Sequence, residues 1–298
     1  MRVHILGSAA GGGFPQWNCN CSNCAGLRTG TLRAKPRTQC SVIVSAEPSR
    51  WALLNASPDL RAQILSFPEL LPNRLMRGSA IDSVLLSDAE LDHVSGLLSL
   101  REAPPLRLYC SQQVFDWVFA LNPAFGALIG PEKFRSNIVE DRNPETIGCG
   151  LGFEAMFVNG KVPTYVKPPA SYDGAVVAYR VIDSCANSSI LHVPAIRQID
   201  DRFLDIAAKC DCILFDGSFW SEDELELRGV GTRTASAMGH IPISGPDGSL
   251  ARLSHLSIRK IYIHVNNTNP ILDEASPERR EIERAGWEVA DDGMDFIV

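Results

Sequence analysis

The stretch that decides the predicted fold is Val84-Leu85-Leu86-Ser87-Asp88-Ala89-Glu90-Leu91-Asp92-His93. Its apolar beginning is typical of a buried strand, and the polar loop after it carries four potential metal ligands, Asp88, Glu90, Asp92 and His93. Neighbouring carboxylates repel one another unless a cation or hydrogen-bond donors compensate them. The loop therefore indicates either a metal site at a strand end or a helix N-terminus, whose dipole favours acidic side chains.

Later segments place similar residues at or near strand ends. Asp216 follows the apolar run Ile213–Phe215, and His264 is expected to lie inside a strand over Lys260–Val265. His240 stands in a glycine-rich loop between them. Each residue alone is typical of a core or a loop. Together they indicate an α/β protein whose site lies on loops at the strand ends.

Strands and helices alternate along the rest of the chain. A hairpin is predicted over Ser41–Ser45 and Trp51–Asn55, and Ser57 is expected to cap a helix that runs to about Ser66. Val162–Val166 is expected to be a strand and Lys167–Gly174 a loop. Further helices are expected over Val94–Leu100, Ser111–Leu121, Asp200–Lys209 and Pro277–Ala285. Because no repeat or linker interrupts the pattern, residues 1–298 are expected to form one domain.

Three cysteines crowd into Trp17-Asn18-Cys19-Asn20-Cys21-Ser22-Asn23-Cys24. A Cys-x-Cys-x-x-Cys spacing brings three thiolates onto one tight turn, and Zn²⁺ takes four tetrahedral ligands with a preference for sulfur. The sequence thus predicts a structural zinc held by Cys19, Cys21 and Cys24, with a fourth ligand from elsewhere. Unrelated buried thiols and a redox role are the alternatives.

Composition narrows the class of protein. The chain has 298 residues, 45% of them hydrophobic, and its 28 basic and 35 acidic residues give a formal charge of −7. An acidic chain without a basic run argues against nucleic-acid binding. No stretch reaches the roughly 20 apolar residues that a membrane span needs, and the first residues lack the apolar core of a secretory signal. We therefore expect a cytoplasmic protein with reduced thiols.

The polar loop and the later Asp and His residues resemble the metallo-β-lactamase superfamily, which implies an αββα four-layer sandwich. The signature loop of that superfamily reads HxHxDH. Here Asp88 and Glu90 replace the two leading His residues, whereas Asp92, His93 and the final metal-binding His264 match.

Two further ligands of that superfamily are missing. No His stands in Asn159-Gly160-Lys161, and Pro194 takes the place where a bridging Asp follows a strand. A zinc phosphodiesterase or lactonase fits the fold but not these replacements, so the resemblance does not imply a two-zinc hydrolase.

Longer blocks resemble the coenzyme PQQ synthesis protein B family. These blocks are Gly7–Cys21, Asn55–Arg61, Gly96–Glu102, Gly229–Thr234 and His264–Asp273. The resemblance implies a role in making pyrroloquinoline quinone (PQQ) from a precursor that contains Glu and Tyr. Two ideas attach to the family, an iron-dependent oxygenase that hydroxylates the tyrosine ring and a non-catalytic carrier of PQQ or its precursor to the periplasm. In a related branch of the superfamily, a His completes the three-Cys zinc site where Asn267 stands here.

One carboxylate and two imidazoles remain of the superfamily's ligands, and we call them the Asp-His-His triad (Asp92, His93 and His264). This ligand set is the one that non-haem Fe(II) oxygenases use. The expected active-site metal is therefore Fe(II) or another divalent ion. The replacements that argue against hydrolysis agree with the oxygenase idea.

Other residues of these loops are assigned supporting roles. Asp88 and Glu90 are expected to accept hydrogen bonds from the imidazoles, and Asp216 and His240 to take part in catalysis, with His240 moving a proton. The expected partner is a dipeptide or other small PQQ precursor, or PQQ itself, whose carboxylates favour arginines and whose ring favours an aromatic neighbour. The residues expected to contact it, for which surface charge and loop packing are equally good interpretations, are Trp17, Arg61, Arg101 and Arg233. We further expect a homo-oligomer.

Overall fold

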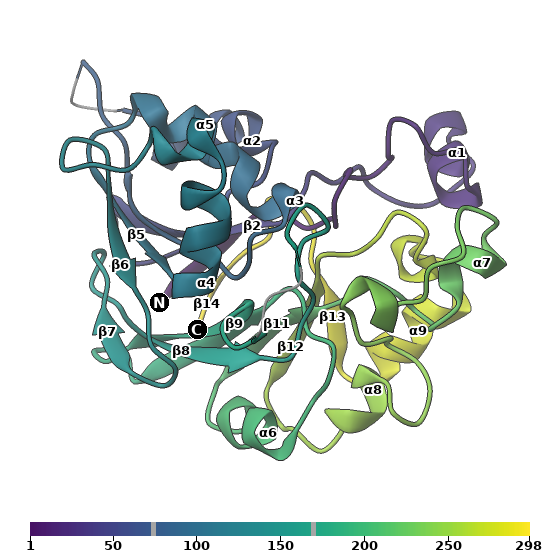
Figure 1. The fold of residues 1–298 in the computed structure, drawn as a ribbon. Coiled ribbons are helices and arrows are strands. Elements are labelled where there is room, and N and C mark those ends of the chain that lie inside the picture. The colour runs from purple at the N-terminus through teal and green to yellow at the C-terminus, as the bar shows by residue number, and fades with distance from the viewer. Residues whose placement is uncertain (73–75, 168–170) are drawn as a thin grey trace.

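Two β-sheets of seven strands each face one another, with helices on both outer sides (Figure 1). The computed structural model describes residues 1–72, 76–167 and 171–298. The first sheet has the strand order β14-β1-β2-β3-β4-β5-β6, and the second has the order β13-β12-β11-β10-β9-β8-β7.

The first sheet consists of β1 (Arg2–Gly7), β2 (Ser41–Glu47), β3 (Arg50–Leu54), β4 (Ile81–Leu85), β5 (Leu106–Cys110), β6 (Phe134–Ile138) and β14 (Asp295–Ile297). The second consists of β7 (Pro144–Thr146), β8 (Gly152–Val158), β9 (Val176–Asp183), β10 (Ser188–Val193), β11 (Cys212–Asp216), β12 (Arg259–Ile263) and β13 (Trp287–Val289).

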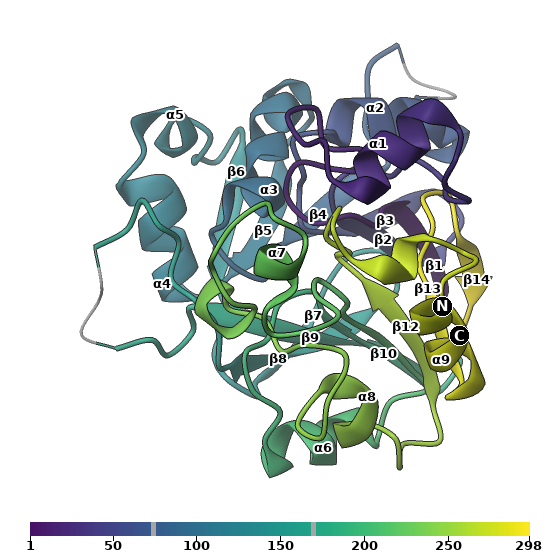
Figure 2. The same ribbon diagram turned by 90° about the vertical axis from the view of Figure 1, so that its right-hand side faces the viewer.

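The helices lie outside the sheets (Figure 1). On the side of the first sheet are α2 (Leu60–Ser66), α3 (Leu91–Val94), α4 (Gln112–Phe115) and α5 (Pro123–Gly126). On the side of the second are α6 (Asp201–Ala207), α8 (Ser249–Arg252) and α9 (Pro277–Arg284). At one end, toward the viewer in Figure 2, are α1 (Ser22–Thr29) and α7 (Glu224–Leu227). Short 3₁₀ helices span Pro68–Leu70, Ser95–Glu102, Ser236–Met238 and Pro270–Leu272, and a π-helical turn spans Asp116–Ala120.

Side chains of central strands alternate between two cores, which explains the layering. Leu85 on β4 and Leu214 on β11 point into the core between the sheets, whereas Val84 and Phe215 point outward into the cores under the helices. Successive residues of a strand point to opposite faces, so a strand with both faces buried is apolar throughout. Three cores between four layers confirm the αββα sandwich that the sequence predicts.

The strand directions bring the polar loops to one place. Three neighbouring strands of the second sheet, β10, β11 and β12, run parallel, and β4 runs parallel to both of its neighbours in the first sheet. The segments that follow β4, β11 and β12 carry His93 (on α3), Ser218 and His264, and these three residues line one cavity.

Several local predictions were wrong for identifiable reasons. Val162–Val166 forms a turn and no strand, since Pro163 cannot donate a ladder hydrogen bond and Val166 donates its backbone N–H to the Pro163 carbonyl. Ser57 does not cap α2, which begins at Leu60; its hydroxyl instead donates to Gln63 Oε1 at 3.0 Å.

Other elements differ in extent from the prediction. The hairpin is confirmed as β2 and β3, which pair antiparallel with Val42 opposite Leu54. The expected helix over Val94–Leu100 is mostly 3₁₀, and β6 was missed because its residues alternate poorly between apolar and polar. Within the loop expected over Lys167–Gly174, residues 168–170 lie outside the described residues. No helix of the described residues is both long enough and apolar enough to cross a membrane.

Candidate metal centres

His93 is held in one orientation by Asp88. Both side chains are buried, and Nδ1 of His93 lies 2.8 and 2.9 Å from the two carboxylate oxygens of Asp88. Nε2 of His93 is buried and has no hydrogen-bond partner among the residues that the structure describes. Because the carboxylate accepts the hydrogen on Nδ1, the lone pair of Nε2 is left for another ligand.

Asp92 and His264 complete this cluster from opposite sheets. Oδ2 of Asp92 lies 3.2 Å from Nε2 of His264, and the His93 and His264 ring centroids are 5.0 Å apart. One ligand atom from each member of the triad lies within 4.8 Å of the other two. Two imidazoles and a carboxylate at this spacing, together with the unpartnered Nε2 of His93, fit a divalent transition metal.

The sequence suggested that His264 lies inside a strand, but it lies directly after β12, which ends at Ile263. Its φ of 58° is in the left-handed region, which costs a residue other than glycine on the order of 1–3 kcal/mol. The hydroxyl of Ser218 holds this conformation, since its Oγ lies 2.8 Å from Nδ1 of His264 and 3.0 Å from the His264 carbonyl oxygen. The side chain is thereby directed so that Nε2 faces Asp92.

Asp216 and His240 form a second pair beside the triad. Nδ1 of His240 lies 2.8 Å from Oδ2 of Asp216, and the His240 ring stacks on His264 with centroids 5.4 Å apart. Ligand atoms of Asp216, His240 and His264 also lie within 4.8 Å of one another. The two residues that the sequence assigns to catalysis are therefore adjacent to the triad, and they could hold a cation themselves, a possibility that sequence reasoning missed.

Burial and charge shift the pKa values of this cluster in different directions. Burial lowers the pKa of His264. Burial acts in the same sense on His93, but the carboxylates of Asp88 and Asp92 outweigh it and raise the pKa well above its usual value. For Asp92, burial acts upward and the neighbouring imidazoles outweigh it, so its pKa is held far below the usual range. A metal that binds Nε2 of His93 must therefore displace a proton.

The triad lines a cavity of about 210 Å³ that also contains Glu90, His240 and Lys161. Nζ of Lys161 lies 3.3 Å from Oε1 of Glu90. Burial and the charge of Asp88 raise the pKa of Glu90. Glu90 therefore faces a lysine, and no contact with an imidazole is seen within the described residues, contrary to expectation. Sequence reasoning missed Lys161, because its segment was considered only for the absence of His.

The expected substrate contacts are not brought to this cavity. None of the four side chains lines it, and Trp17 is 86% exposed. Arg101 is also exposed and pairs with its neighbour Glu102 at 2.7 Å. Arg61 and Arg233 are exposed as well. The prediction relied on closeness in sequence to conspicuous motifs, whereas the folded loops direct these side chains to solvent.

The three cysteines form a second candidate centre. One sulfur atom from each of Cys19, Cys21 and Cys24 lies within 4.8 Å of the others, and Cys24 lies on α1, a helix that the sequence did not reveal. Nδ2 of Asn267 lies 3.2, 3.6 and 3.4 Å from the sulfurs of Cys19, Cys21 and Cys24. Three thiols at this spacing, those of Cys21 and Cys24 buried, fit a zinc ion. The amide of Asn267 occupies the fourth corner, where it can donate to thiolates or, when rotated, present its oxygen to a metal.

The loop after His264 connects the two centres. Asn266 lines the triad cavity, Asn267 faces the thiols, and Thr268 donates a hydrogen bond to the buried carboxylate of Glu224. Asn269 donates to the Gly217 carbonyl at 2.9 Å, which ties the loop to the end of β11. Each polar side chain from Asn266 to Asn269 thus has an identified contact.

Comparisons with known proteins agree with this architecture. The beta-lactamase superfamily domain matches residues 50–265. The coenzyme PQQ synthesis protein B of Stutzerimonas stutzeri is 44% identical over 300 residues, with 99% of both chains covered. The protein of that name from Acinetobacter baumannii (strain ACICU) is 41% identical over 310 residues, again with 99% of both covered.

Solved structures give the same result. A crystal structure of Zn²⁺-bound PqqB from Methylobacterium extorquens matches with a TM-score of 0.94 and 38% identity, covering 100% of both chains. A diphosphatase from the PhnP family shares the fold alone, with a TM-score of 0.70 and 17% identity over 100% of this chain and 97% of that one. Full-length identity of this size, on a matching fold, shows that the chain belongs to the coenzyme PQQ synthesis protein B family within the beta-lactamase superfamily.

Proposed function

We propose that the protein acts in PQQ biosynthesis as an iron- and O₂-dependent hydroxylase of a tyrosine-derived precursor that contains Glu and Tyr. The observation that carries the proposal is the Asp-His-His triad, in which Asp92 Oδ2 is 3.2 Å from His264 Nε2 and His93 Nε2 has no other partner in the described residues. A bound Fe(II) with this ligand set supplies O₂ activation next to the substrate. Insertion of one oxygen atom into an aromatic C–H bond reduces the other to water, which consumes two electrons from an external reductant and two protons.

The protein's own residues hold the substrate and move protons. His240 lines the cavity, and Asp216 accepts the hydrogen on its Nδ1, so Nε2 is the nitrogen available to exchange a proton with a phenol. Lys161 places a positive charge at the same cavity, where it can pair with an anionic group of the substrate. Oγ of Ser218 contacts Nδ1 of His240 and Nδ1 of His264 and so fixes the orientation of the two rings.

The test is a single-turnover reaction. Purified protein is loaded anaerobically with Fe(II), mixed with a Glu–Tyr dipeptide and a reductant, and exposed to O₂, and the products are analysed by mass spectrometry. We expect a product heavier by one oxygen atom, and its loss in His93→Ala and His264→Ala. The exposed His255 provides the matched control, His255→Ala, which should retain turnover. Absence of oxygenated product from wild type would overturn the proposal.

A carrier of PQQ or its precursor is the second candidate. It is favoured by Asp88 and Glu90, which stand at leading ligand positions and contact His93 and Lys161. A carrier binds the quinone without changing it. Binding of PQQ without any oxygen-dependent product would therefore support this candidate over the hydroxylase.

A further inference from the structure

The triad cavity is too small for the whole proposed substrate. Its volume is about 210 Å³, whereas pockets for small ligands usually measure about 300–1,000 Å³. An aromatic ring fits into such a space. The rest of a Glu- and Tyr-containing molecule, with its charged amino-acid groups, needs a second space that is continuous with the first.

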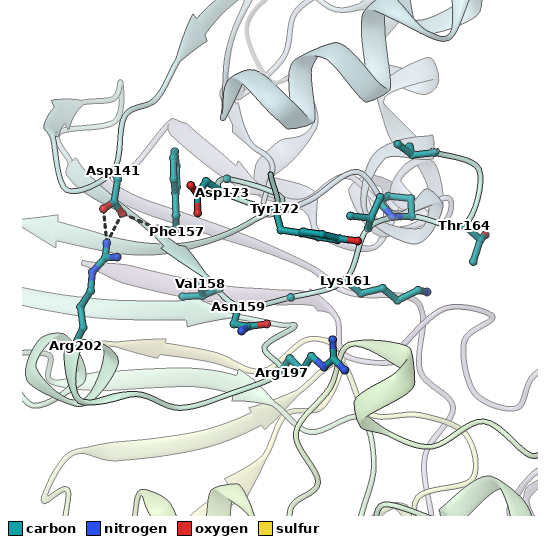
Figure 3. Close-up of a pocket in the computed structure, with 15 residues that line it drawn as sticks. Asp141, Phe157, Val158, Asn159, Lys161, Thr164, Tyr172, Asp173, Arg197 and Arg202 are labelled. Atoms are coloured by element: carbon teal, nitrogen blue, oxygen red, sulfur yellow. Dashed lines mark hydrogen bonds and ion pairs between the residues drawn. The ribbon is translucent and has the colours of Figure 1, made fainter. Parts of the chain in front are cut away.

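A larger groove of about 1120 Å³ (Figure 3) lies beside the cavity, and Lys161 lines both spaces. The turn that carries Lys161 is tightly fixed between the two spaces. A Cβ atom on Gly160 would lie 2.2 Å from Cγ2 of Val176, which lines the cavity, and one on Gly239 would lie 2.5 Å from Cβ of Lys161. Tyr165 donates its hydroxyl hydrogen to the Ala89 carbonyl at 2.5 Å, which ties the groove's loop to the triad loop.

Among the described residues, one cation of the groove has no counterion. At one end of the groove Arg202 pairs with Asp141, and at the other end lie Arg197 and Lys161 (Figure 3). Lys161 is paired with Glu90. Arg197 is exposed, and no carboxylate of the described residues lies within ion-pair distance of its guanidinium. Its backbone N–H donates to the Asn159 carbonyl at 2.8 Å, so its main chain is anchored against the same turn.

We propose that this groove binds the carboxylate-bearing, amino-acid part of the substrate, with Arg197 pairing with a carboxylate, while the aromatic ring enters the triad cavity past Lys161. Tyr172 and Phe157 also line the groove and provide apolar contact for the carbon chain. An arginine fork matches the two oxygens of a carboxylate, and such charge-assisted pairs are the stronger hydrogen bonds. The inference deepens the proposed function and rests on it for the identity of the substrate.

The test measures binding in the absence of oxygen, so that no turnover occurs. Glu–Tyr dipeptide is titrated anaerobically into the metal-loaded protein by calorimetry. We expect Arg197→Gln to bind the dipeptide about tenfold more weakly than wild type. The matched control is Arg284→Gln, an exposed arginine on α9, which packs against β13 at the other edge of the second sheet. This variant should bind as wild type does.

A double-mutant cycle identifies the contact. Dipeptides in which each carboxylate in turn is an amide are titrated into wild type and Arg197→Gln. We expect one of the amide dipeptides to bind wild type about tenfold more weakly than the unmodified dipeptide does. Arg197→Gln should bind that amide and the unmodified dipeptide with equal affinity. Each of three results would overturn the groove proposal. These are a wild type that does not bind the dipeptide, an Arg197→Gln variant that binds it with wild-type affinity, and losses of affinity from the variant and from each amide that are strictly additive. Arg197-dependent binding without oxygenated product in the turnover experiment would support the groove and overturn the hydroxylase.

Discussion

Asp88 orients His93, because both carboxylate oxygens of Asp88 lie within 2.9 Å of Nδ1 of His93. In the signature loop of the superfamily, this position holds a leading His. Here the same position holds Asp88, which orients the triad residue His93. We therefore expect metal affinity at the triad to depend on Asp88 through its contact with His93.

Asp88→Asn should weaken metal binding without unfolding the protein. The amide preserves the size of the side chain but removes the charge that favours the Nδ1 hydrogen, and loss of such a support typically costs 10- to 100-fold in metal affinity. The measurement is an anaerobic Fe(II) titration against a chelating dye. Asp223→Asn, at an exposed carboxylate, is the control. Equal affinities of wild type and Asp88→Asn would contradict the role assigned to Asp88.

Ser218→Ala should reduce both stability and metal affinity. The hydroxyl contacts Nδ1 of His264 at 2.8 Å and Oδ1 of Asp216 at 2.7 Å. Asp216 Oδ1 keeps the backbone N–H of Ser218 as a donor, whereas the buried Nδ1 of His264 would lose its hydrogen-bond partner among the described residues. We expect the free energy of unfolding of the metal-free protein to fall by about 1–3 kcal/mol. Urea unfolding measures this change, with Ser221→Ala as the control because the Ser221 hydroxyl donates to the exposed Asp223. If Ser218→Ala is as stable as the wild type, the Ser218 hydroxyl does not stabilise the left-handed conformation of His264.

Cys24→Ser should abolish tightly bound zinc. A serine oxygen is a poor substitute for a buried thiolate, and structural zinc contributes directly to folding free energy. We expect the zinc content per chain, measured by elemental analysis, to fall close to zero and the unfolding temperature to drop. Cys185→Ser, at an exposed cysteine, should leave both unchanged. If the wild type contains no zinc and Cys24→Ser is as stable as the wild type, the cysteines are not a zinc site.

Stability should depend on pH through Glu224. Burial raises the pKa of this carboxyl to about 7 in the folded protein, well above its value of about 4.3 in an unfolded chain. A raised pKa contributes stability that is complete below about pH 4.3 and is lost as the pH rises through 7.

Glu224→Gln should remove this loss. We expect the variant to be more stable than wild type at pH 8, by on the order of 2 kcal/mol, and the difference to shrink toward pH 5. Thermal unfolding across this range measures the effect, and Glu226→Gln on the exposed side of α7 should follow the wild-type curve. A constant difference across the pH range would exclude titration of Glu224 as its origin.

The sequence indicated an α/β fold with polar residues at strand ends because both depend on local patterns. The αββα sandwich and the choice of the Asp-His-His triad came from the resemblance to the superfamily. Apolar runs that end in Asp or His place ligands at strand ends whatever the details of packing. Lys161 could not be found in this way, since its importance comes from a turn packed between Gly239 and Val176, and neither residue is near it in sequence. The conformation of His264 was equally hidden, because it depends on Ser218 from a different strand end.

The segment from Asn266 to Asn269 has one further consequence. Its first side chain lines the triad cavity and its second touches the thiols of the cysteine centre. A segment this short has few conformations that satisfy both ends, so an ion bound at one end removes freedom that binding at the other would otherwise have to remove. Thermodynamic reciprocity then requires that each ion strengthen the retention of the other by the same factor. If both clusters hold a metal, removing the ion from the cysteines should therefore weaken metal binding at the triad.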